Sequence, residues 1–381
     1  MHDVIVIGGG PAGAFCAQHL AKKGFSCLLL ERSKPDRYKS CGGIINSQAF
    51  QSAPIPDSCV QRTIERMRIH SLHNVVELNM EKEAYTIYRT EYDQWLREQA
   101  QDRGVQVHYG EDVKKVDLRT PTVKTTSTYS CRVVVGAFGA CPCLYDEFGV
   151  SIPRWIQMVQ QEFSLPGQEV TDTIGNCIEF YFDTHYASYG FSWIIPKCEG
   201  VTVGAVFTPR TVKKRQRLTA FIRDHQKKLK GIQPKKFKRK FTFGGFLPFN
   251  PVTPSHGDHF LLVGDSAGFC DPVTFEGIPS ALNSGRMAAQ AIEDHLEQGT
   301  SLARYEHLWK RDLYESDIKP AQTLRRLLYG HPHSDALLDT AVGLACKDTD
   351  VHTALQWLFC KHESRKKVRD IFMNKKLYSI S

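Results

Sequence analysis

Apolar residues follow three different spacings along this chain of 381 residues. Continuous apolar runs at residues 4–7, 26–30, 131–135 and 259–263 predict buried strands. Loose alternation at 63–78 and alternation at 155–163, 177–182, 189–195 and 200–207 predict a mainly antiparallel sheet rich in aromatic residues. From residue 301 onward, apolar residues recur every three or four positions, which predicts helices.

The first predicted strand leads directly into a glycine-rich turn. Gly8, Gly10 and Gly13 have G-x-G-x-x-G spacing, and residues 14–23 predict a helix. In this setting Gly8 makes the tight turn, Gly10 lets a pyrophosphate approach, and Gly13 allows close helix–strand contact. Glu31, which ends the second predicted strand, can bond a ribose hydroxyl and favours an adenosine ribose without a 2′-phosphate. The N-terminus therefore predicts dinucleotide binding.

A second loop, residues 264–278, stands in a similar setting near the other end of the chain. It follows the predicted strand at 259–263 and precedes a helix rich in small residues at 279–292. Asp265 can bond a hydroxyl or bridge to a phosphate, and the N-terminus of the following helix carries partial positive charge. We expect both loops to build one cofactor site.

Composition narrows the class of protein. No apolar run approaches the ~18 residues that a membrane span needs, and the start has the pattern of neither a signal nor a transit peptide. The twelve cysteines are scattered without the spacing of a metal site, which is typical of buried thiols in a reducing compartment. We expect a cytoplasmic protein without a structural metal.

The net charge of +8 is concentrated in one segment. Between residues 210 and 240 a single acid, Asp224, faces Arg210, Lys213, Lys214, Arg215, Arg217, Arg223, Lys227, Lys228, Lys230, Lys235, Lys236, Lys238, Arg239 and Lys240. These residues form either a solvated helix and strand edge or a surface for anionic membrane lipid or a phosphorylated substrate. No nucleic-acid-binding module accompanies them. A second basic, amphipathic segment spans residues 361–377.

Five motifs occur in one order along the chain. They are Gly8-x-Gly10-x-x-Gly13, Cys41-Gly42-Gly43, Arg89-x-x-x-Asp93, residues 189–197 (YGFSWIIPK), and residues 264–278. Together they resemble the geranylgeranyl reductase family, within the larger group of FAD enzymes similar to p-hydroxybenzoate hydroxylase. The resemblance covers about residues 1–300, and its most specific piece is Asp-Pro-x-Thr-x-Glu-Gly-Ile at 271–278.

The resemblance implies an α/β fold of three parts. A Rossmann-like FAD-binding domain similar to that of p-hydroxybenzoate hydroxylase is expected at residues 1–60, 96–150 and 245–300. An inserted, mainly antiparallel β-sheet domain for the substrate is expected at 61–95 and 151–244. Residues 301–381 are expected to form a helical C-terminal cap.

The resemblance also implies an activity, the saturation of carbon–carbon double bonds in a polyprenyl chain, with or without a phosphate group. A two-electron reduction needs a hydride donor that side chains cannot supply, which agrees with a flavin. The FAD-binding residues are then expected to be Gly8, Gly10, Pro11, Ala12, Gly13, Glu31, Arg32, Cys41, Gly42, Gly43, Arg89, Gly264, Asp265, Gly277 and Ile278. Cys41, Tyr189 and Trp193 are the catalytic candidates, with Tyr189 and Trp193 expected to hold an apolar chain over the flavin.

Two further roles are open for residues of this set. A proton donor is needed at the second carbon, and Cys41, Tyr181, Tyr186 and Tyr189 are candidates of equal standing. Cys41 and Cys270 lie on the two loops expected to flank the flavin. They form either a redox-sensitive pair or two independent buried thiols.

Other readings of the same scaffold remain open. A flavin-dependent monooxygenase or halogenase acting on an aromatic or apolar small molecule is the main alternative, although halogenases usually have two tryptophans where this chain has Phe191 and Trp193. A non-catalytic flavin- or lipid-binding protein is the third. Related enzymes usually carry Asp-Gly where this chain has Phe138-Gly139. This departure puts direct reduction by NAD(P)H in doubt and leaves NAD(P)H or a donor such as ferredoxin open.

Overall fold

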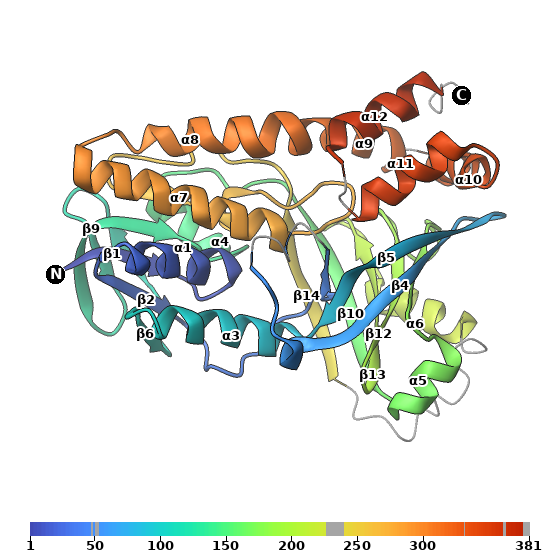
Figure 1. Cartoon of the computed structure of the whole chain (residues 1–381), viewed down its shortest axis with the longest axis horizontal. Helices are drawn as coiled ribbons and strands as arrows, with labels where there is room; N and C mark the ends of the chain where they lie inside the picture. The colour runs from blue at the N-terminus through green and yellow to red at the C-terminus, as the bar shows by residue number, and fades with distance from the viewer. Residues whose placement is uncertain (47–48, 50–52, 226–239, 331, 361–362, 376–381) are drawn as a thin grey trace.

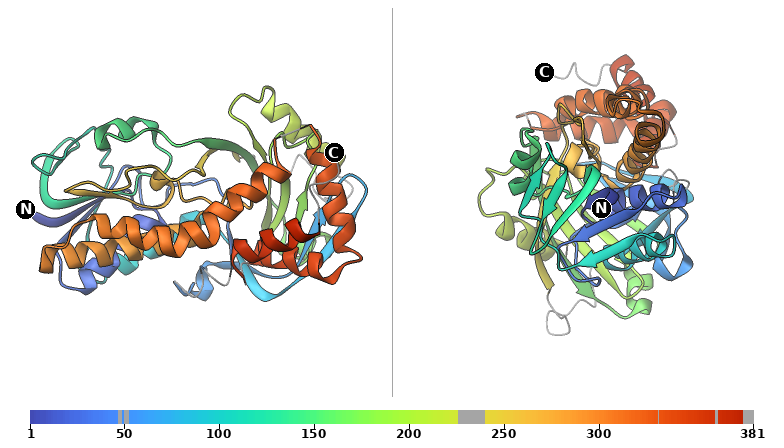
Figure 2. Two further views of the ribbon diagram at one scale, coloured as in Figure 1. Left: turned by 90° about the horizontal axis from the view of Figure 1, so that it is seen from above. Right: turned by 90° about the vertical axis from the view of Figure 1, so that its left-hand side faces the viewer.

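The computed structural model of the chain describes residues 1–46, 49, 53–225, 240–330, 332–360 and 363–375. The molecule is elongated, with one β-sheet in each half and the two termini toward opposite ends (Figure 1, Figure 2). Helices α7 (Ile278–Gln298) and α8 (Ala303–Trp309) lie along the half that contains the N-terminus, and the last helices cover the other half (Figure 1). The expected α/β class with a helical C-terminal region is confirmed.

The first sheet has a parallel core. Its order is β6 (Gln106–Tyr109), β2 (Cys27–Glu31), β1 (His2–Ile7), β9 (Thr128–Gly136), β8 (Thr122–Lys124) and β7 (Lys115–Asp117), and β15 (Phe260–Leu262) also pairs with β9. β6, β2, β1, β9 and β15 are parallel, whereas β7, β8 and β9 pair antiparallel. β1, β2, β9 and β15 contain continuous apolar runs, as is typical of parallel strands covered by helices, whereas β6 at the edge of the sheet is more polar.

Two helices bring the two glycine-rich loops together. Helix α1 (Pro11–Lys22) packs between α3 (Arg89–Gln101) and α7. A Cβ on Gly285 of α7 would lie 2.5 Å from the Ala12 carbonyl oxygen, and one on Gly264 would lie 2.9 Å from Ala12 Cβ. Since only small residues permit this approach, the start of α1 and the loop before α7 lie side by side.

The second sheet carries most of the alternating strands. Its order is β14 (Lys240–Pro248), β10 (Trp155–Ser164), β13 (Gly200–Phe207), β12 (Ser192–Lys197), β11 (Cys177–Tyr181), β4 (Val60–His70), β5 (Val75–Ile87) and β3 (Ile44–Ile45). The β11–β4 pair is parallel and the others are antiparallel. The predicted strand at 189–195 is shorter than expected at its start, because Gly190 has a φ of +79° and the chain enters β12 only at Ser192.

The two faces of this sheet pack against different helices. Phe180 points into a core shared with the C-terminal helices, whereas its neighbour Tyr181 points into a core shared with α6 (Lys214–Asp224). The period of two in β11 therefore places one aromatic face under the helical cap.

The other helical elements are η1 (Asp57–Cys59), α4 (Pro142–Tyr145), η2 (Asp146–Phe148), α5 (Gly167–Thr173), η4 (Gly264–Ala267), η5 (Lys310–Ile318), α9 (Lys319–Leu328), α10 (Ser334–Ala345), α11 (Thr349–Cys360) and α12 (Arg365–Asn374).

Candidate active site

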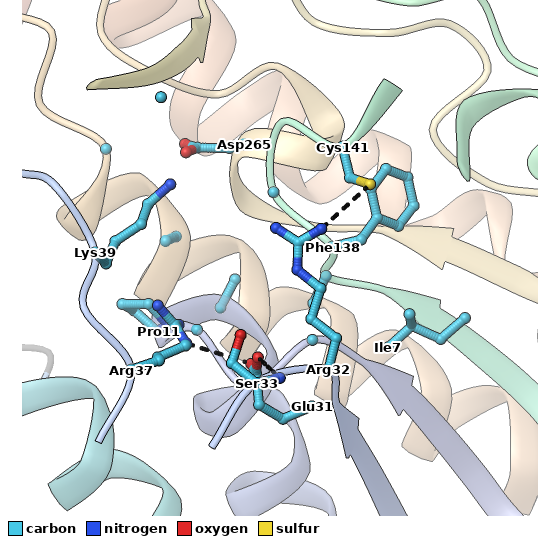
Figure 3. A pocket seen from close by; sticks show the side chains of 18 of the residues that line it. Ile7, Pro11, Glu31, Arg32, Ser33, Arg37, Lys39, Phe138, Cys141 and Asp265 are labelled. Atoms are coloured by element: carbon cyan, nitrogen blue, oxygen red, sulfur yellow. Dashed lines mark hydrogen bonds and ion pairs between the residues drawn. The ribbon is translucent and has the colours of Figure 1, made fainter. Parts of the chain in front are cut away.

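A cavity of about 240 Å³ lies between the start of α1, the end of β2 and the loop that leads into α7. Figure 3 shows side chains that line it, drawn from elements far apart in the sequence. The expected binding residues among its lining are Gly8, Gly10, Pro11, Ala12, Glu31, Arg32, Cys41, Arg89, Asp265, Gly277 and Ile278. Gly13 and Gly264 do not line the cavity but pack closely against Gly8 and Ala12, which do. Gly42 and Gly43 line a neighbouring pocket.

The glycines at the start of α1 leave room where a side chain would collide with backbone. A Cβ on Gly8, whose φ is +108°, would lie 2.3 Å from the Ala137 carbonyl oxygen, and one on Gly13 would lie 2.1 Å from the Gly8 carbonyl oxygen. At Gly10 the nearest atom is 3.8 Å away, a nitrogen of Arg37. The first amides of α1 have no partner within the helix, so this open side suits an anion.

A charged network forms the wall around Glu31. Its carboxylate, 5% exposed, accepts hydrogen bonds from the amides of Gly9 and Ser33, both at 2.9 Å. Arg37 bridges this wall to α3, with Nε 3.5 Å from Glu31 and Nη2 2.8 Å from Asp93. Glu31 is therefore held at the end of β2 by backbone amides and a neighbouring cation.

Arg89 is positioned by its own helix. Nε and Nη2 of Arg89 donate to the two oxygens of Asp93 at 2.6 and 2.9 Å. Burial would raise the pKa of the Asp93 carboxyl, but Arg89 and Arg37 outweigh burial, and this pKa lies below its ordinary value. Asp93 therefore stays ionised and fixes both guanidinium groups beside the cavity.

Two opposite charges face each other across the cavity. Figure 3 shows Lys39 pointing toward Asp265, and the charge of each side chain acts on the pKa of the other. Burial raises the pKa of the Asp265 carboxyl, against the attraction of Lys39 and Arg89. Burial lowers the pKa of Lys39, against the attraction of Asp265. Sequence reasoning missed Lys39, which lies in a polar loop without a motif.

Residues 41–43 form a short strip of backbone that packs closely against neighbouring backbone. Gly43 has a φ of +67°, and a Cβ there would lie 2.2 Å from the Ile87 carbonyl oxygen. Lys197, only 1% exposed, donates from Nζ to the carbonyl oxygens of Gly42 and Ile87 at 2.7 and 2.9 Å. Burial lowers the pKa of Lys197 to about 8. Its sequence signal was its place at the end of the 189–197 motif.

A second, apolar pocket of about 80 Å³ adjoins the first cavity. Both are lined by Cys41, Met158, Leu247, Phe275, Gly277 and Ile278, which makes these residues a shared wall. Phe180, Phe191 and Trp193 from the second sheet and Phe359 from α11 line the apolar pocket. Glu276 also lines it and accepts a hydrogen bond from Asn46 at 3.0 Å.

The structure separates the catalytic candidates. Cys41 lines both cavities and Trp193 lines the apolar pocket. Tyr189 lies outside both linings, and its hydroxyl accepts a hydrogen bond from Arg325 at 2.6 Å. Tyr181 and Tyr186 also lie outside these linings, with hydroxyls that donate to Glu179 and Asp224. The alternation at 189–195 predicts that Tyr189 and Trp193 share a strand and a face. The chain turns at Gly190, whose φ is +79°, and Tyr189 does not line the pocket that Trp193 lines.

The two cysteines proposed as a redox pair differ in environment. Neither Cys41 nor Cys270 forms a disulfide bond. Cys41 lines both cavities, whereas Cys270 is 0% exposed and lines neither.

The comparisons with known proteins agree with this geometry. Residues 1–165 match the family described as FAD binding domain. Digeranylgeranylglycerophospholipid reductase 2 of Methanothermobacter thermautotrophicus is 28% identical over 90% of this chain and 92% of its own length. The chloroplastic geranylgeranyl diphosphate reductase of Arabidopsis thaliana is 27% identical over 88% of this chain and 76% of its own length. This chain is an FAD-dependent oxidoreductase related to the geranylgeranyl reductases.

Solved structures show the same fold. A geranylgeranyl bacteriochlorophyll reductase-like protein from Thermoplasma acidophilum has a TM-score of 0.83 at 21% identity, covering 98% of this chain and 96% of its own. A flavin-dependent brominase has a TM-score of 0.74 at 20% identity, covering 98% of both chains. At this identity both similarities describe the fold and not the reaction.

The residues of the larger cavity suit FAD. The open start of α1 and the cation Lys39 suit the pyrophosphate, and Glu31 lies where an adenosine ribose is bound in this type of fold. Arg32 lies at the same end, with Nη1 3.8 Å from Cys141 Sγ (Figure 3). At the opposite wall, Gly277 caps the N-terminus of α7 and Ile278 begins this helix, and both residues line the cavity. We propose the predicted set as the FAD-binding residues of this oxidoreductase, with Lys39 and Arg37 added.

Among the described residues, no group of three or more His, Cys, Asp or Glu side chains is arranged to hold a metal ion. Over the same part of the chain, no helix has both the length and the hydropathy that crossing a bilayer requires.

Proposed function

We propose that this oxidoreductase saturates carbon–carbon double bonds of a polyprenyl chain of the geranylgeranyl type. The observation that carries the proposal is the shared wall between the FAD cavity and the apolar pocket. An aromatic pocket that meets a flavin cavity along one short strip suits an apolar chain whose double bond must lie beside the flavin. Bound FAD, once reduced by an electron donor, would supply the hydride.

The side chains of the pocket position the chain and exclude water. Phe180, Phe191 and Phe359 form one aromatic group, with ring centroids 4.5 Å apart for Phe180–Phe191 and 5.2 Å apart for Phe180–Phe359. The helical cap contributes Phe359, so it closes the pocket opposite the sheet. We propose that residues 61–95 and 151–244 bind the substrate together with this cap.

A proton must also reach the second carbon of the double bond. Two titratable side chains line the apolar pocket among the described residues, Cys41 and Glu276. Cys41 touches both cavities, so we propose it as the proton donor. A Cys41→Ser variant that keeps FAD but loses turnover would support this role. If only Glu276→Gln loses turnover, the carboxyl group is the donor instead.

The decisive experiment is a product analysis. FAD-loaded protein is reduced with dithionite and incubated without oxygen with geranylgeranyl diphosphate and, separately, with a prenylated lipid. Mass gains of two hydrogens per step in the product establish the reductase and show which chain is accepted. No gain, with substrate oxygenation once air is admitted, would establish a monooxygenase.

The same assay identifies the electron donor that reduces FAD. Replacing dithionite by NADPH or by reduced ferredoxin tests which one supports turnover.

The proposal of contact with an anionic membrane rests on the basic residues between 210 and 240, of which residues 226–239 lie outside the described part of the chain. Sedimentation with vesicles containing an anionic phospholipid, compared with neutral vesicles, tests that contact.

A further inference from the structure

Phe275 has a backbone conformation that is unusual for its residue type. Its φ is +60°, and Lys213 is the other non-glycine residue with a positive φ among the described residues. L-residues disfavour this region because Cβ approaches the backbone, and a bulky side chain there is a genuine outlier. Such a conformation persists only where the surroundings impose it, and it points to a role for the side chain.

The loop around Phe275 is held from several sides. The Phe275 amide donates to the Asp271 carbonyl oxygen at 3.0 Å, and the Asp271 amide donates to the Glu276 carbonyl oxygen at 2.9 Å. The Asp271 carboxylate accepts the amides of Val273 and Thr274 at 2.8 and 3.0 Å. These bonds close a compact turn whose backbone cannot relax at Phe275 alone.

The helical cap fixes the same loop. Arg365 of α12 donates from Nε to Asp271 at 2.8 Å, and the two side chains are 1% and 4% exposed. The hydroxyl of Tyr329 donates to the Val273 carbonyl oxygen at 3.1 Å. The ring of Phe275 is thus held at a set place between the first sheet, the second sheet and the cap.

That place is the boundary between the two cavities. Phe275 lines both the FAD cavity and the apolar pocket. Its ring packs on Phe191 and Tyr329, with centroids 5.5 and 5.9 Å apart. Gly190 makes room for it, because a Cβ there would lie 2.5 Å from the Phe275 ring. The ring occupies space that would otherwise extend the apolar pocket, whose volume is about 80 Å³, toward the flavin site.

We propose that Phe275 is a specificity-determining residue that limits how much of an apolar chain fits beside the flavin. The inference rests on the proposed function and deepens it, because it concerns which prenyl chain the same pocket accepts. The strained loop fixes the ring at the junction of the two cavities, where the volume of the ring favours short chains. A smaller residue at this position admits longer chains.

The test compares chain-length preference in binding, without turnover. Calorimetry on oxidised, FAD-loaded protein measures the affinities for geranyl diphosphate and geranylgeranyl diphosphate in the wild type, Phe275→Leu and Phe275→Gly. Each additional buried methylene changes an affinity by about fourfold. We expect the ratio of affinities to shift toward the longer chain by about tenfold in Phe275→Gly and by less in Phe275→Leu, which also serves if the glycine variant does not fold.

The matched variant is Phe180→Ala, which removes an aromatic ring from the apolar pocket but not from the FAD cavity. An equal shift in Phe180→Ala would show that pocket volume alone matters and would overturn the proposal. An unchanged ratio in both Phe275 variants would also overturn it, while leaving the proposed function intact. If neither the wild type nor any variant binds either prenyl diphosphate, and the product analysis with the prenylated lipid also shows no gain of hydrogen, the proposed function itself fails and this inference fails with it.

Discussion

The FAD cavity and the apolar pocket share one wall but are built in different ways. Around the FAD cavity, glycines bring backbone against backbone, and Arg37, Arg89 and Asp93 form a charged network. Around the apolar pocket, aromatic side chains from the second sheet meet a ring from the helical cap. The cavity that we propose for FAD therefore depends on close backbone approach, whereas the pocket that we propose for the substrate depends on how distant side chains pack.

The shared wall is where the two constructions meet. Cys41 belongs to a strip held by Lys197, and Phe275 belongs to a loop held by Arg365. A change at the shared wall should therefore affect both cavities, and a change on either side should affect one. Variants can be ordered by how strongly they test this difference.

The largest effect is expected at Gly8. In Gly8→Ala the new Cβ meets the Ala137 carbonyl oxygen at 2.3 Å at a φ of +108°. Backbone strain and overpacking together cost about 2–6 kcal/mol of unfolding free energy. We expect protein that purifies without FAD, measured by its visible absorbance, and that melts at a lower temperature.

The matched variant is Gly24→Ala, which also has a positive φ (+91°) but no atom within 4 Å of the new Cβ. It should keep FAD and lose only about 1–2 kcal/mol. Full FAD occupancy in Gly8→Ala would contradict the backbone account of the cofactor site.

The next effect is expected at the buried ion pair that holds the loop of Phe275. Arg365→Met removes the guanidinium that lies 2.8 Å from Asp271. Loss of one partner of a buried pair costs about 3–5 kcal/mol of unfolding free energy. Urea unfolding should show this loss, and prenyl binding and FAD binding should both weaken, because the loop that Arg365 holds carries Phe275, which lines both cavities.

Lys319→Met is the comparison for an exposed pair. Lys319 and Glu315 lie 2.9 Å apart with both side chains exposed, so their loss should cost less than about 1 kcal/mol. Equal losses in the two variants would show that the buried pair does not anchor the loop.

A third effect concerns pH and the strip that contains Cys41. Burial lowers the pKa of Lys197 to about 8 from its ordinary value of 10.5. Between these pH values the unfolded chain binds more protons than the folded one, so the stability that Lys197 contributes rises with pH. Relative to Lys197→Met, the wild type should gain up to about 3 kcal/mol across this window.

The neutral amine can still donate to the carbonyl oxygens of Gly42 and Ile87, so the strip need not open as Lys197 loses its proton. The check is thermal unfolding of both proteins at the two ends of the window. A difference that stays constant with pH would show that Lys197 titrates normally in the folded state.

The smallest effect is expected in a comparison of two substitutions of Phe275. Phe275→Gly and Phe275→Ala both remove the packing of the side chain, but only glycine relieves the φ of +60°. The glycine variant should therefore be more stable than the alanine variant by about 1 kcal/mol, the reverse of the usual order. Chemical denaturation measures it, and alanine proving the more stable would show that the loop relaxes.

Most strands, the first helix and the class of fold were predictable from residues that act on their neighbours in the sequence. The spacing of Gly8, Gly10 and Gly13 predicts a turn between strand and helix, and the apolar runs predict the parallel strands. The alternation in residues 155–207 predicts the second sheet. Helical periodicity after residue 301 predicts the cap, although not the ring of Phe359 that it places in the pocket.

The other residues of the site depend on neighbours far away in the sequence. Tyr189 belongs to the same motif as Trp193, yet a left-handed glycine and Arg325 place it elsewhere. Lys39 carries no signal of its own, because what distinguishes it is burial and the charges around it. Lys197 and Glu276 stand in the 189–197 and 271–278 motifs, but their hydrogen-bond partners come from distant segments. Phe275 stands at an unspecified position of the 271–278 run, and its backbone angle is not encoded by its residue type.

The sequence by itself determined the strand–turn–helix unit of an FAD-binding fold and an aromatic-rich sheet, since glycine geometry and hydrophobic period act locally. Only the tertiary structure decided which side chains face the flavin cavity, which line the apolar pocket and which separate the two. The reason is physical: a contact between residues from opposite ends of the chain depends on how whole elements pack. Small residues such as Gly285 and Ala12 permit that packing, but the contact exists only in the folded molecule.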